Sequence, residues 1–273
     1  MNSRSASLFF PFLVAAAVLA ATPGLRPEPQ TDSRIPDQTA KIAQARDKIQ
    51  EGWNAWNEEA MKAGRDRLLS LLLEDKGINA RQNTYLYYYA GLGEYRLAVH
   101  AFASGLADEA ASNIARAKKY LEKLFELQPG WGEPYALYAA LLGYEIALNP
   151  DRGMELGMKT FSHFGRAESA EPRNPRVFLL KGLSLLYWPA EYGGGPDNAL
   201  VVLARAEALF ENDESDDPLK PSWGLEECLT FMARAHVQKG EKEKAMDCLK
   251  RASIANPDYG LARQELLALQ KDQ

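Results

Sequence analysis

The sequence predicts an all-α fold in which consecutive antiparallel helix pairs stack side by side. From residue 37 onward, apolar residues recur at helical spacing, and no segment shows the two-residue alternation of a strand. Turn-forming residues interrupt this pattern, and one motif of small and apolar residues recurs along the chain. The 273 residues, of which 46% are hydrophobic and 25% charged, supply enough apolar material for one large domain or an elongated array.

The N-terminal residues are not part of this predicted fold. After the single charge of Arg4 comes the fourteen-residue apolar run Leu8–Ala21, the layout of a secretory signal peptide cleaved after Ala20 or Ala21. The alternative is a membrane anchor, but a helix that spans a bilayer needs about 20 apolar residues, and Pro11 interrupts this run. We therefore predict a signal peptide over the first 21 residues, no membrane span after its removal, and an exported protein that is periplasmic or secreted.

The segment Thr22–Pro36 holds four of the fifteen prolines and no apolar periodicity, which predicts a flexible linker before a helical domain over residues 37–273. Removal of the signal peptide takes away Arg4 and no acidic residue, so the net charge changes from −5 to −6. A mildly acidic chain without a stretch rich in lysine and arginine argues against nucleic acid as a partner.

Within the helical domain, clusters of Gly, Pro and Asn divide the chain into about ten helices of roughly 14 to 22 residues. These breaks lie at Gly77, Pro129–Gly130, Asn149–Pro150, Pro172–Pro175, Pro189–Pro196, Pro218–Pro221, Gly240 and Pro257. Short connections between helices favour antiparallel neighbours.

The clearest helix pair is the last one, a 34-residue segment from Glu226 to Tyr259. Small residues stand where two helices cross closely, Leu and Met fill the space beside them, a glycine makes the turn, and a proline follows the second helix. The eight positions that follow this scheme are Leu229, Met232, Ala233, Gly240, Ala245, Leu249, Ala252 and Pro257. In these residues the segment resembles a tetratricopeptide (TPR) repeat, which implies a right-handed superhelical array, an α-solenoid.

The second-helix motif of this pair, a small residue followed by apolar residues four and seven positions later, recurs upstream. Copies stand at Ala199, Leu203 and Ala206, at Thr160, Phe164 and Ala167, at Ala117, Leu121 and Leu124, and more weakly at Gly64, Leu68 and Leu71. The small residue of the first helix recurs as Ala90, Ala139, Gly182 and Ala233. The resemblance therefore predicts about five helix pairs, with a solvating cap at Asp258–Lys271.

The repeats depart from the TPR consensus in length. The four good copies of the motif are 43, 39 and 46 residues apart, whereas the consensus repeat has about 34 residues. We expect the extra residues around the turn inside each pair, at one edge of the solenoid, where insertions in repeat proteins often form a binding face.

No constellation in the sequence predicts catalysis, a metal site or a cofactor. His100, His163 and His236 fall in three different repeats, and the chain lacks H-E-x-x-H, paired C-x-x-C and G-x-S-x-G motifs. Cys228 and Cys248 both lie in the last pair of a chain predicted to be exported, so a disulfide is possible, but their helical phases favour two separate buried thiols. We therefore predict that the protein is not an enzyme.

The most unusual stretch is a glycine-rich loop before Pro196, with the candidate residues Tyr192, Gly193, Gly194 and Gly195. One interpretation is a loop whose backbone amides bind an anion at the start of the next helix. The other, which we favour, is an elongated turn with glycines at positive φ and Pro196 at the first helical position. No Gly-Lys-Ser/Thr follows, so a P-loop is excluded. The stretch also resembles the Pro-x-x-Tyr/Phe-Gly-Gly loop of some bacterial exported TPR proteins.

The aromatic residues predict a binding surface, because in TPR proteins the first helix of each pair lines the concave groove. Five positions after the small residue of the first helix, three successive pairs carry a tyrosine: Tyr95, Tyr144 and Tyr187. Tyr87 extends this set, and Arg234 lies near the groove in the last pair. Tyrosine combines a large rigid apolar face with a hydroxyl group and is enriched in recognition surfaces. The alternative is that these rings simply pack between helices.

Two hypotheses of different class follow. The first is an extracytoplasmic scaffold that binds a protein or peptide partner in its groove. The second is a solute-binding accessory component of an envelope transport system, with a small molecule held between the long helices.

Overall fold

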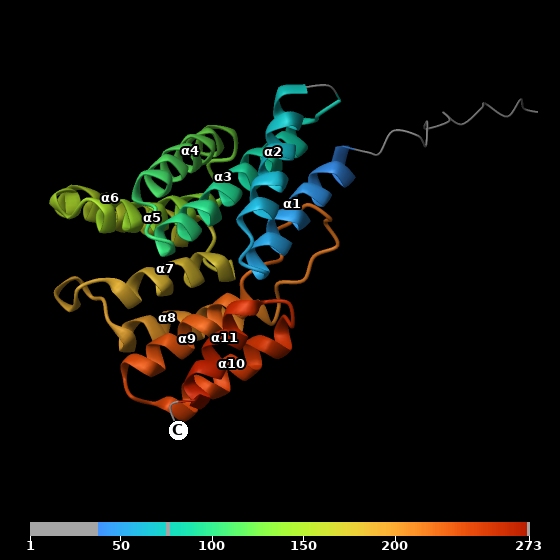
Figure 1. Ribbon diagram of the computed structural model, residues 1–273. Coiled ribbons are helices and arrows are strands. Elements are labelled where there is room, and N and C mark those ends of the chain that lie inside the picture. Colours follow the sequence, from blue (N-terminus) through green and yellow to red (C-terminus); the bar gives the residue numbers. More distant parts are fainter. Residues whose placement is uncertain (1–37, 75–76, 272–273) are drawn as a thin grey trace, which may run out of the picture. The chain divides into compact units, whose positions relative to one another are not determined.

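The computed structural model of this protein describes residues 38–74 and 77–271, so the predicted signal peptide and linker lie outside the described residues. The described residues form eleven α-helices and two short 3-10 helices (Figure 1). Their bounds are α1 (Gln38–Asn54), α2 (Glu58–Glu74), α3 (Ala80–Ala103), α4 (Ala107–Leu127), α5 (Gly132–Leu148), η1 (Pro150–Arg152), α6 (Gly153–Ala170), α7 (Pro175–Tyr187), η2 (Ala190–Tyr192), α8 (Pro196–Phe210), α9 (Leu225–Gln238), α10 (Lys242–Ala255) and α11 (Gly260–Lys271).

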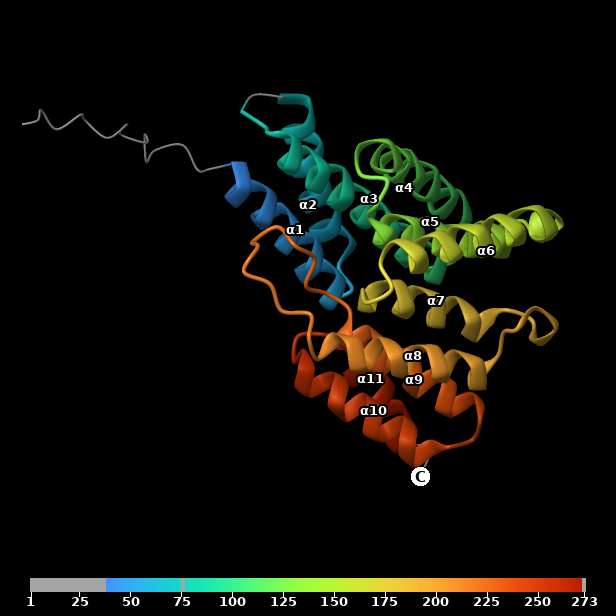
Figure 2. The same cartoon turned by 180° about the vertical axis from the view of Figure 1, so that it is seen from behind.

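Consecutive helices pair as antiparallel neighbours, from α1 with α2 to α9 with α10, and each pair packs against the next (Figures 1 and 2). Helix α11 packs against α10 at the end of the array and exposes Leu267, as expected of a cap. No strand occurs in the described residues, so the predicted all-α solenoid of helix pairs is confirmed. Among the same residues, no helix combines the length and the apolar composition that a membrane span requires.

Several helices begin at the residues that local chemistry favours. The side chain of Asn79 accepts the N–H of Gln82, and the side chain of Gln82 accepts the N–H of Asn79, which is a capping box at the start of α3. Helices α7 and α8 begin at Pro175 and Pro196, where the missing proline N–H removes no helical hydrogen bond. The breaks marked by these prolines in the sequence are therefore real helix boundaries.

The repeated motif of small and apolar residues forms the seam of each helix pair. All fifteen residues of its five copies, from Gly64 in α2 to Ala252 in α10, are buried. At the first copy, a Cβ added to Gly64 would lie 2.7 Å from the carbonyl oxygen of Ala45 in α1, too close for a carbon atom. The small residues therefore stand where the helices cross most closely, as the sequence predicted.

We expect the Gly64→Ala substitution to lower the free energy of unfolding by about 1 to 3 kcal/mol, because the added Cβ overlaps the backbone of α1. The matched control is Gly165→Ala in α6, where an added Cβ meets nothing within 4 Å. Since alanine is the better helix former, this control should stabilise the protein by about 0.5 to 1 kcal/mol. Urea denaturation measures both, and a stabilised Gly64→Ala variant would contradict the close crossing.

The extra length of the repeats lies only partly where the spacing predicted it. The turn between α7 and α8 does contain additional residues, 188–195. Between the fourth and fifth pairs, however, the main addition is residues 211–224, which join α8 to α9 and therefore lie between pairs. The prediction was wrong here because the distance between two motifs counts every residue between two second helices. It does not distinguish a long turn from a long connection.

Residues 211–224, which we call the closing segment, run beside α1 and help to bring the last helix pair against the first (Figures 1 and 2). Arg46 Nη1 of α1 donates a hydrogen bond to the carbonyl oxygen of Pro218 at 2.6 Å. Trp53 Nε1, also in α1, donates to Glu227 Oε1 of α9 at 3.0 Å. An open solenoid has contacts only between neighbouring repeats. In this protein the two ends of the array also meet.

Candidate functional site

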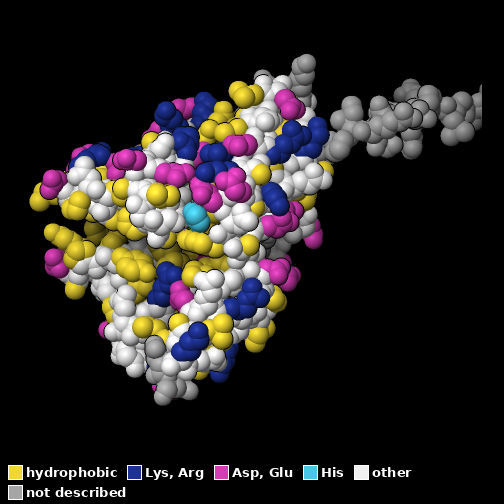
Figure 3. All heavy atoms as spheres, viewed as in Figure 1, with side chains coloured by type: hydrophobic (Ala, Val, Ile, Leu, Met, Phe, Trp, Pro, Cys, Tyr) yellow, Lys and Arg dark blue, Asp and Glu magenta, His cyan; other side chains and the backbone are white. Residues whose placement is uncertain are grey.

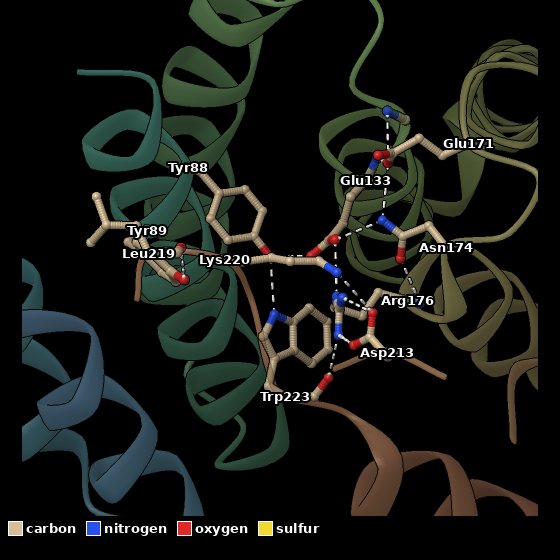
Figure 4. Close-up of polar contacts among 11 residues, drawn as sticks. Tyr88, Tyr89, Glu133, Glu171, Asn174, Arg176, Asp213, Leu219, Lys220 and Trp223 are labelled. Carbon is tan, nitrogen blue, oxygen red and sulfur yellow. Dashed lines mark hydrogen bonds and ion pairs between the residues drawn. The ribbon is translucent and has the colours of Figure 1, made fainter. Parts of the chain in front are cut away.

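Helices α3, α5, α7 and α9, the first helices of their pairs, contact one another in succession, and we call their shared face the inner surface. Its half near the N-terminal ends of α5 and α7 is occupied by the closing segment (Figure 4). There Tyr88, Glu133 and Arg176 meet Asp213 and Trp223. The protein's own chain thus fills part of the groove in which the sequence analysis placed a partner.

Arg176 is the centre of a buried ionic network. Its side chain is 1% exposed; Nε donates to Glu133 Oε2 at 2.9 Å, and Nη1 and Nη2 donate to the two carboxylate oxygens of Asp213 at 2.6 and 3.0 Å. Burial by itself lowers the pKa of Arg176, but the Glu133 and Asp213 carboxylates outweigh it and raise that pKa. The guanidinium group is therefore always charged, and it links α5 and α7 to the closing segment.

The Glu133 carboxylate, also 1% exposed, collects its donors from two helices. Tyr88 Oη of α3 donates to Glu133 Oε1. Two groups donate to Oε2 at 2.9 Å each, Nδ2 of Asn174, which is the N-cap of α7, and Nε of Arg176 in α7. Trp223 Nε1 of the closing segment donates to Tyr88 Oη at 2.9 Å. Burial raises the pKa of Tyr88 well above its ordinary value, so the phenol stays protonated and keeps donating. Because these charged groups are partnered, the network holds the closing segment in place.

A second buried charge lies where the last pair meets the first. Arg96 of α3 is 1% exposed, and its guanidinium carbon lies 5.3 Å from the ring centroid of Trp53 and 5.4 Å from that of Trp223. Its Nη2 is 3.5 Å from Glu227 Oε1, the oxygen that also accepts the Trp53 indole N–H. Burial raises the pKa of Glu227 to about 7, although the charge of Arg96 acts in the opposite direction.

The raised pKa of Glu227 predicts that the contribution of this residue to stability falls as the pH rises. The folded state holds this proton up to about pH 7, whereas the unfolded state releases it near 4.5. The contribution is therefore fully present below about pH 4.5 and is lost as the pH rises through 7, by up to about 3 kcal/mol. Glu227→Gln should remove this dependence. As the pH rises from 5 to 8, the unfolding free energy of the variant should therefore increase relative to that of the parent. A constant difference across that range would contradict the shift.

Three of the predicted groove tyrosines lie together on the other half of the inner surface. The rings of Tyr95 and Tyr144 are in edge contact, with centroids 6.3 Å apart. Tyr187 lies close enough to Tyr144 and to Arg234 for the three groups to interact electrostatically. The exposed fraction rises along this row, from 3% for Tyr95 to 60% for Tyr187. Tyr95 therefore packs in the core, and Tyr187 is available to a partner.

The other two predicted groove residues make separate contacts. The ring of Tyr87 faces Tyr120 of α4, with centroids 6.4 Å apart, so Tyr87 packs within its own helix pair. Arg234 pairs with Glu265 of α11, with Nη2 to Oε1 at 2.6 Å, and its guanidinium carbon lies 4.8 Å from the ring of Phe231. The cap helix thus balances the charge of Arg234 beside Tyr187.

Next to Tyr187 the surface opens into an apolar hollow that the sequence analysis did not predict. On one side, α6 exposes Met154, Met158 and Phe161. On the other, after α7, the Trp188 ring lies 4.7 Å from the ring of Phe161. Hydrophobic side chains line both walls of this hollow, between α6 and α7 (Figure 3). We define the aromatic surface as Phe102, Tyr144, Met154, Met158, Phe161, Tyr187, Trp188 and Tyr192.

A signal for this hollow was present in the sequence. Met154, Met158 and Phe161 are spaced i, i+4, i+7 and so share one face of α6. The seam motif of α6 already accounts for the apolar residues that pack against α5. The packing of the helix pair does not require a second apolar stripe on the same helix, so this stripe indicates an exposed apolar face.

The glycine-rich loop adopts the turn that we favoured over an anion site. Gly193 and Gly195 have φ of 79° and 101°, and a Cβ at Gly194 would overlap the backbone carbonyl of Trp188. The amides of all three glycines donate to carbonyl oxygens of the preceding residues, at 2.8 to 3.1 Å. These donors are engaged within the chain, so the loop positions Tyr192 at 61% exposure and provides no anion cradle.

The histidines and cysteines have structural surroundings. His100 and His163 contact aromatic rings, and His236 pairs with a glutamate in the following turn. In the part of the chain that the structure describes, no three His, Cys, Asp or Glu side chains are grouped so as to hold a metal ion. Cys228 and Cys248 are separate buried thiols, and burial raises the pKa of each, to about 11 for Cys248.

No protein-family model matches the sequence, and no match was found among curated proteins. Solved structures are similar in fold. The HusA haemophore from Porphyromonas gingivalis is 22% identical, with a TM-score of 0.56 over 74% of this chain and 92% of that chain. A thermophilic TPR protein from Thermus thermophilus, TTC0263, is 18% identical, with a TM-score of 0.50 over 83% of this chain and 98% of that one. At this level of identity the likeness shows the fold alone, and this chain has a TPR-like fold.

Proposed function

We propose that this chain is an exported binding protein that holds an apolar segment of a partner protein on its aromatic surface. The observation that carries the proposal is the division of the inner surface. The closing segment fills one half, where Arg176 binds Asp213 and Tyr88 binds Trp223. The other half presents aromatic and methionine side chains to solvent, from the partly buried Tyr144 and the exposed Tyr187 to Phe161 on α6.

The composition of the aromatic surface favours an amphipathic helix as the bound segment. Aromatic rings supply large rigid contacts, and methionine adapts its shape to the partner. The stripe of Met154, Met158 and Phe161 has the i, i+4, i+7 spacing with which a helix packs against another helix. Large exposed apolar side chains gathered in one place on a soluble domain mark interaction sites.

The proposal also contains two expectations from the sequence, export and binding without catalysis. The layout of the first 21 residues supports export. The engagement of the buried Arg176, Glu133 and Asp213 charges with one another supports a scaffold, because these groups already serve the packing of the chain.

The test is capture of partners from the exported fraction by immobilised residues 22–273, followed by mass spectrometry. We expect Phe161→Ala combined with Tyr187→Ala to reduce capture of the specific partner about tenfold or more, because buried aromatic anchors dominate such interfaces. The matched control combines Val201→Ala and Ile254→Ala, which are 72% and 80% exposed outside the aromatic surface. If both double variants capture the same proteins in the same amounts as the parent, the assignment of the surface is wrong.

A second candidate function, binding of a small apolar solute, is favoured by the hollow between α6 and α7 and by the fold shared with a haemophore. Titration of residues 22–273 with haem, followed by its absorbance and by tryptophan fluorescence, tests this candidate. Saturable binding that is lost in the Phe161→Ala, Tyr187→Ala variant and kept in the control would favour a solute over a protein segment.

A further inference from the structure

A cavity of about 190 Å³ lies at the junction of the first and last helix pairs, away from the aromatic surface. Its walls come from α1, α3, the closing segment and the ends of α9 and α10, so it exists only because the array closes. Ile49, Leu92, Tyr89 and Trp223 supply apolar walls. The charged side chains on its walls are Arg46, Asp47, Arg96 and Glu226.

Arg96 in this cavity packs against the rings of Trp53 and Trp223, but its hydrogen-bond donors are incompletely paired. It has five N–H donors and is 1% exposed, yet its ion pair with Glu227 is long, at 3.5 Å, and its Nε has no hydrogen-bond partner. An unpaired buried donor on a charged group is costly, and protein interiors rarely leave one unsatisfied. Arg176, equally buried, shows the usual solution with four hydrogen bonds. The contrast indicates that Arg96 awaits an acceptor from outside the chain.

The remaining charged side chains of the cavity indicate which group a ligand would carry besides an acceptor for Arg96. Glu226 is 7% exposed, and its Oε1 accepts one hydrogen bond, from Asn256 Nδ2 at 3.0 Å. Arg46 is engaged by Asp47 and by the carbonyl oxygen of Pro218, so these two groups largely satisfy each other at the rim. One buried cation and one buried anion in the same cavity suit a molecule that carries both a carboxylate and an ammonium group.

We propose that this cavity binds a small zwitterion of the amino-acid class, with its carboxylate on Arg96, its ammonium group on Glu226, and its side chain against the apolar walls. The volume of about 190 Å³ suits a small molecule of this class, because pockets for drug-sized ligands measure about 300 to 1,000 Å³. The site is separate from the proposed protein-binding surface, and the two are tested by different variants.

Binding is measured by isothermal titration calorimetry on residues 22–273, with alanine, valine, leucine and methionine as probes. Saturable binding of at least one probe is expected. The analogue of that probe without the ammonium group and the analogue without the carboxylate should each bind about tenfold more weakly or worse, because each loses a hydrogen-bonded charge. An analogue that binds as tightly as the zwitterion, or no binding by any probe, would overturn the proposal.

Two variants localise the site. Ala255→Trp fills the mouth of the cavity from an exposed position and should abolish binding, whereas Ile254→Trp, the adjacent exposed position that does not line the cavity, should preserve it. Arg96→Met should also abolish binding, and the Ala255 variant keeps the test decisive if the Arg96 variant fails to fold. Equal binding by the parent and Ala255→Trp would show that the ligand binds elsewhere.

Discussion

Replacing Arg176 by methionine is expected to lower the free energy of unfolding by about 3 to 5 kcal/mol, the range measured when one partner of a buried ion pair is removed. The variant leaves the buried Glu133 carboxylate and the partly buried Asp213 carboxylate without their shared cation. It also removes the hydrogen bond to the Trp223 carbonyl, which holds the closing segment. Guanidinium denaturation followed by circular dichroism measures the loss.

The matched control is Arg173→Met, an exposed position three residues earlier in the chain, where a change within about 0.5 kcal/mol is expected. A second comparison separates lost charge from lost packing. In the Arg176→Met, Glu133→Gln double variant one of the uncompensated charges is gone, so part of the stability should return. If Arg176→Met unfolds like the parent, the network does not hold the closing segment.

Ala206→Trp should destabilise the protein by about 3 kcal/mol or more, because overpacking of a tight core is costly. Ala206 belongs to the seam of the fourth helix pair and is fully buried. The indole ring would separate α7 from α8 and disturb the connection into the closing segment. Native-state hydrogen exchange should show the loss of protection first in these helices.

Ala208→Trp provides the control, because Ala208 lies two residues later in the same helix and is exposed. This substitution should change the free energy of unfolding by less than about 0.5 kcal/mol. Equal melting of both variants would remove the evidence that small residues at the helix crossings hold the repeats together.

Closure of the array has a consequence for folding. In an open solenoid the stability is close to a sum of repeat and neighbour terms, so the ends unfold first. Here Trp53 of the first pair and Arg96 of the second contact Glu227 of the last, and the closing segment contacts α1 through Arg46. These contacts link distant parts of the chain, and they make the terminal pairs less independent than in an open array.

The site could be predicted from the sequence only in part. The row of Tyr95, Tyr144 and Tyr187 followed from repeat spacing, and the structure brings these residues together. Spacing along a helix gives the face of a residue but not its depth, so the burial of Tyr95 and the exposure of Tyr187 were not predictable. The helical spacing of Met154, Met158 and Phe161 is visible in the sequence, but the sequence analysis did not interpret it as an exposed apolar face.

By itself, the sequence determined the helices, their pairing and the seams, because these depend on local signals. The seam motif, the capping box at Asn79 and the prolines that start α7 and α8 each act within a few residues or within one repeat. Only the tertiary structure decided where the closing segment lies and which charges it binds. Asp213 meets Arg176 across 37 positions and Trp223 meets Tyr88 across 135, without any periodicity that would relate them. Such contacts arise from the path of the whole array, which brings the two ends together in space.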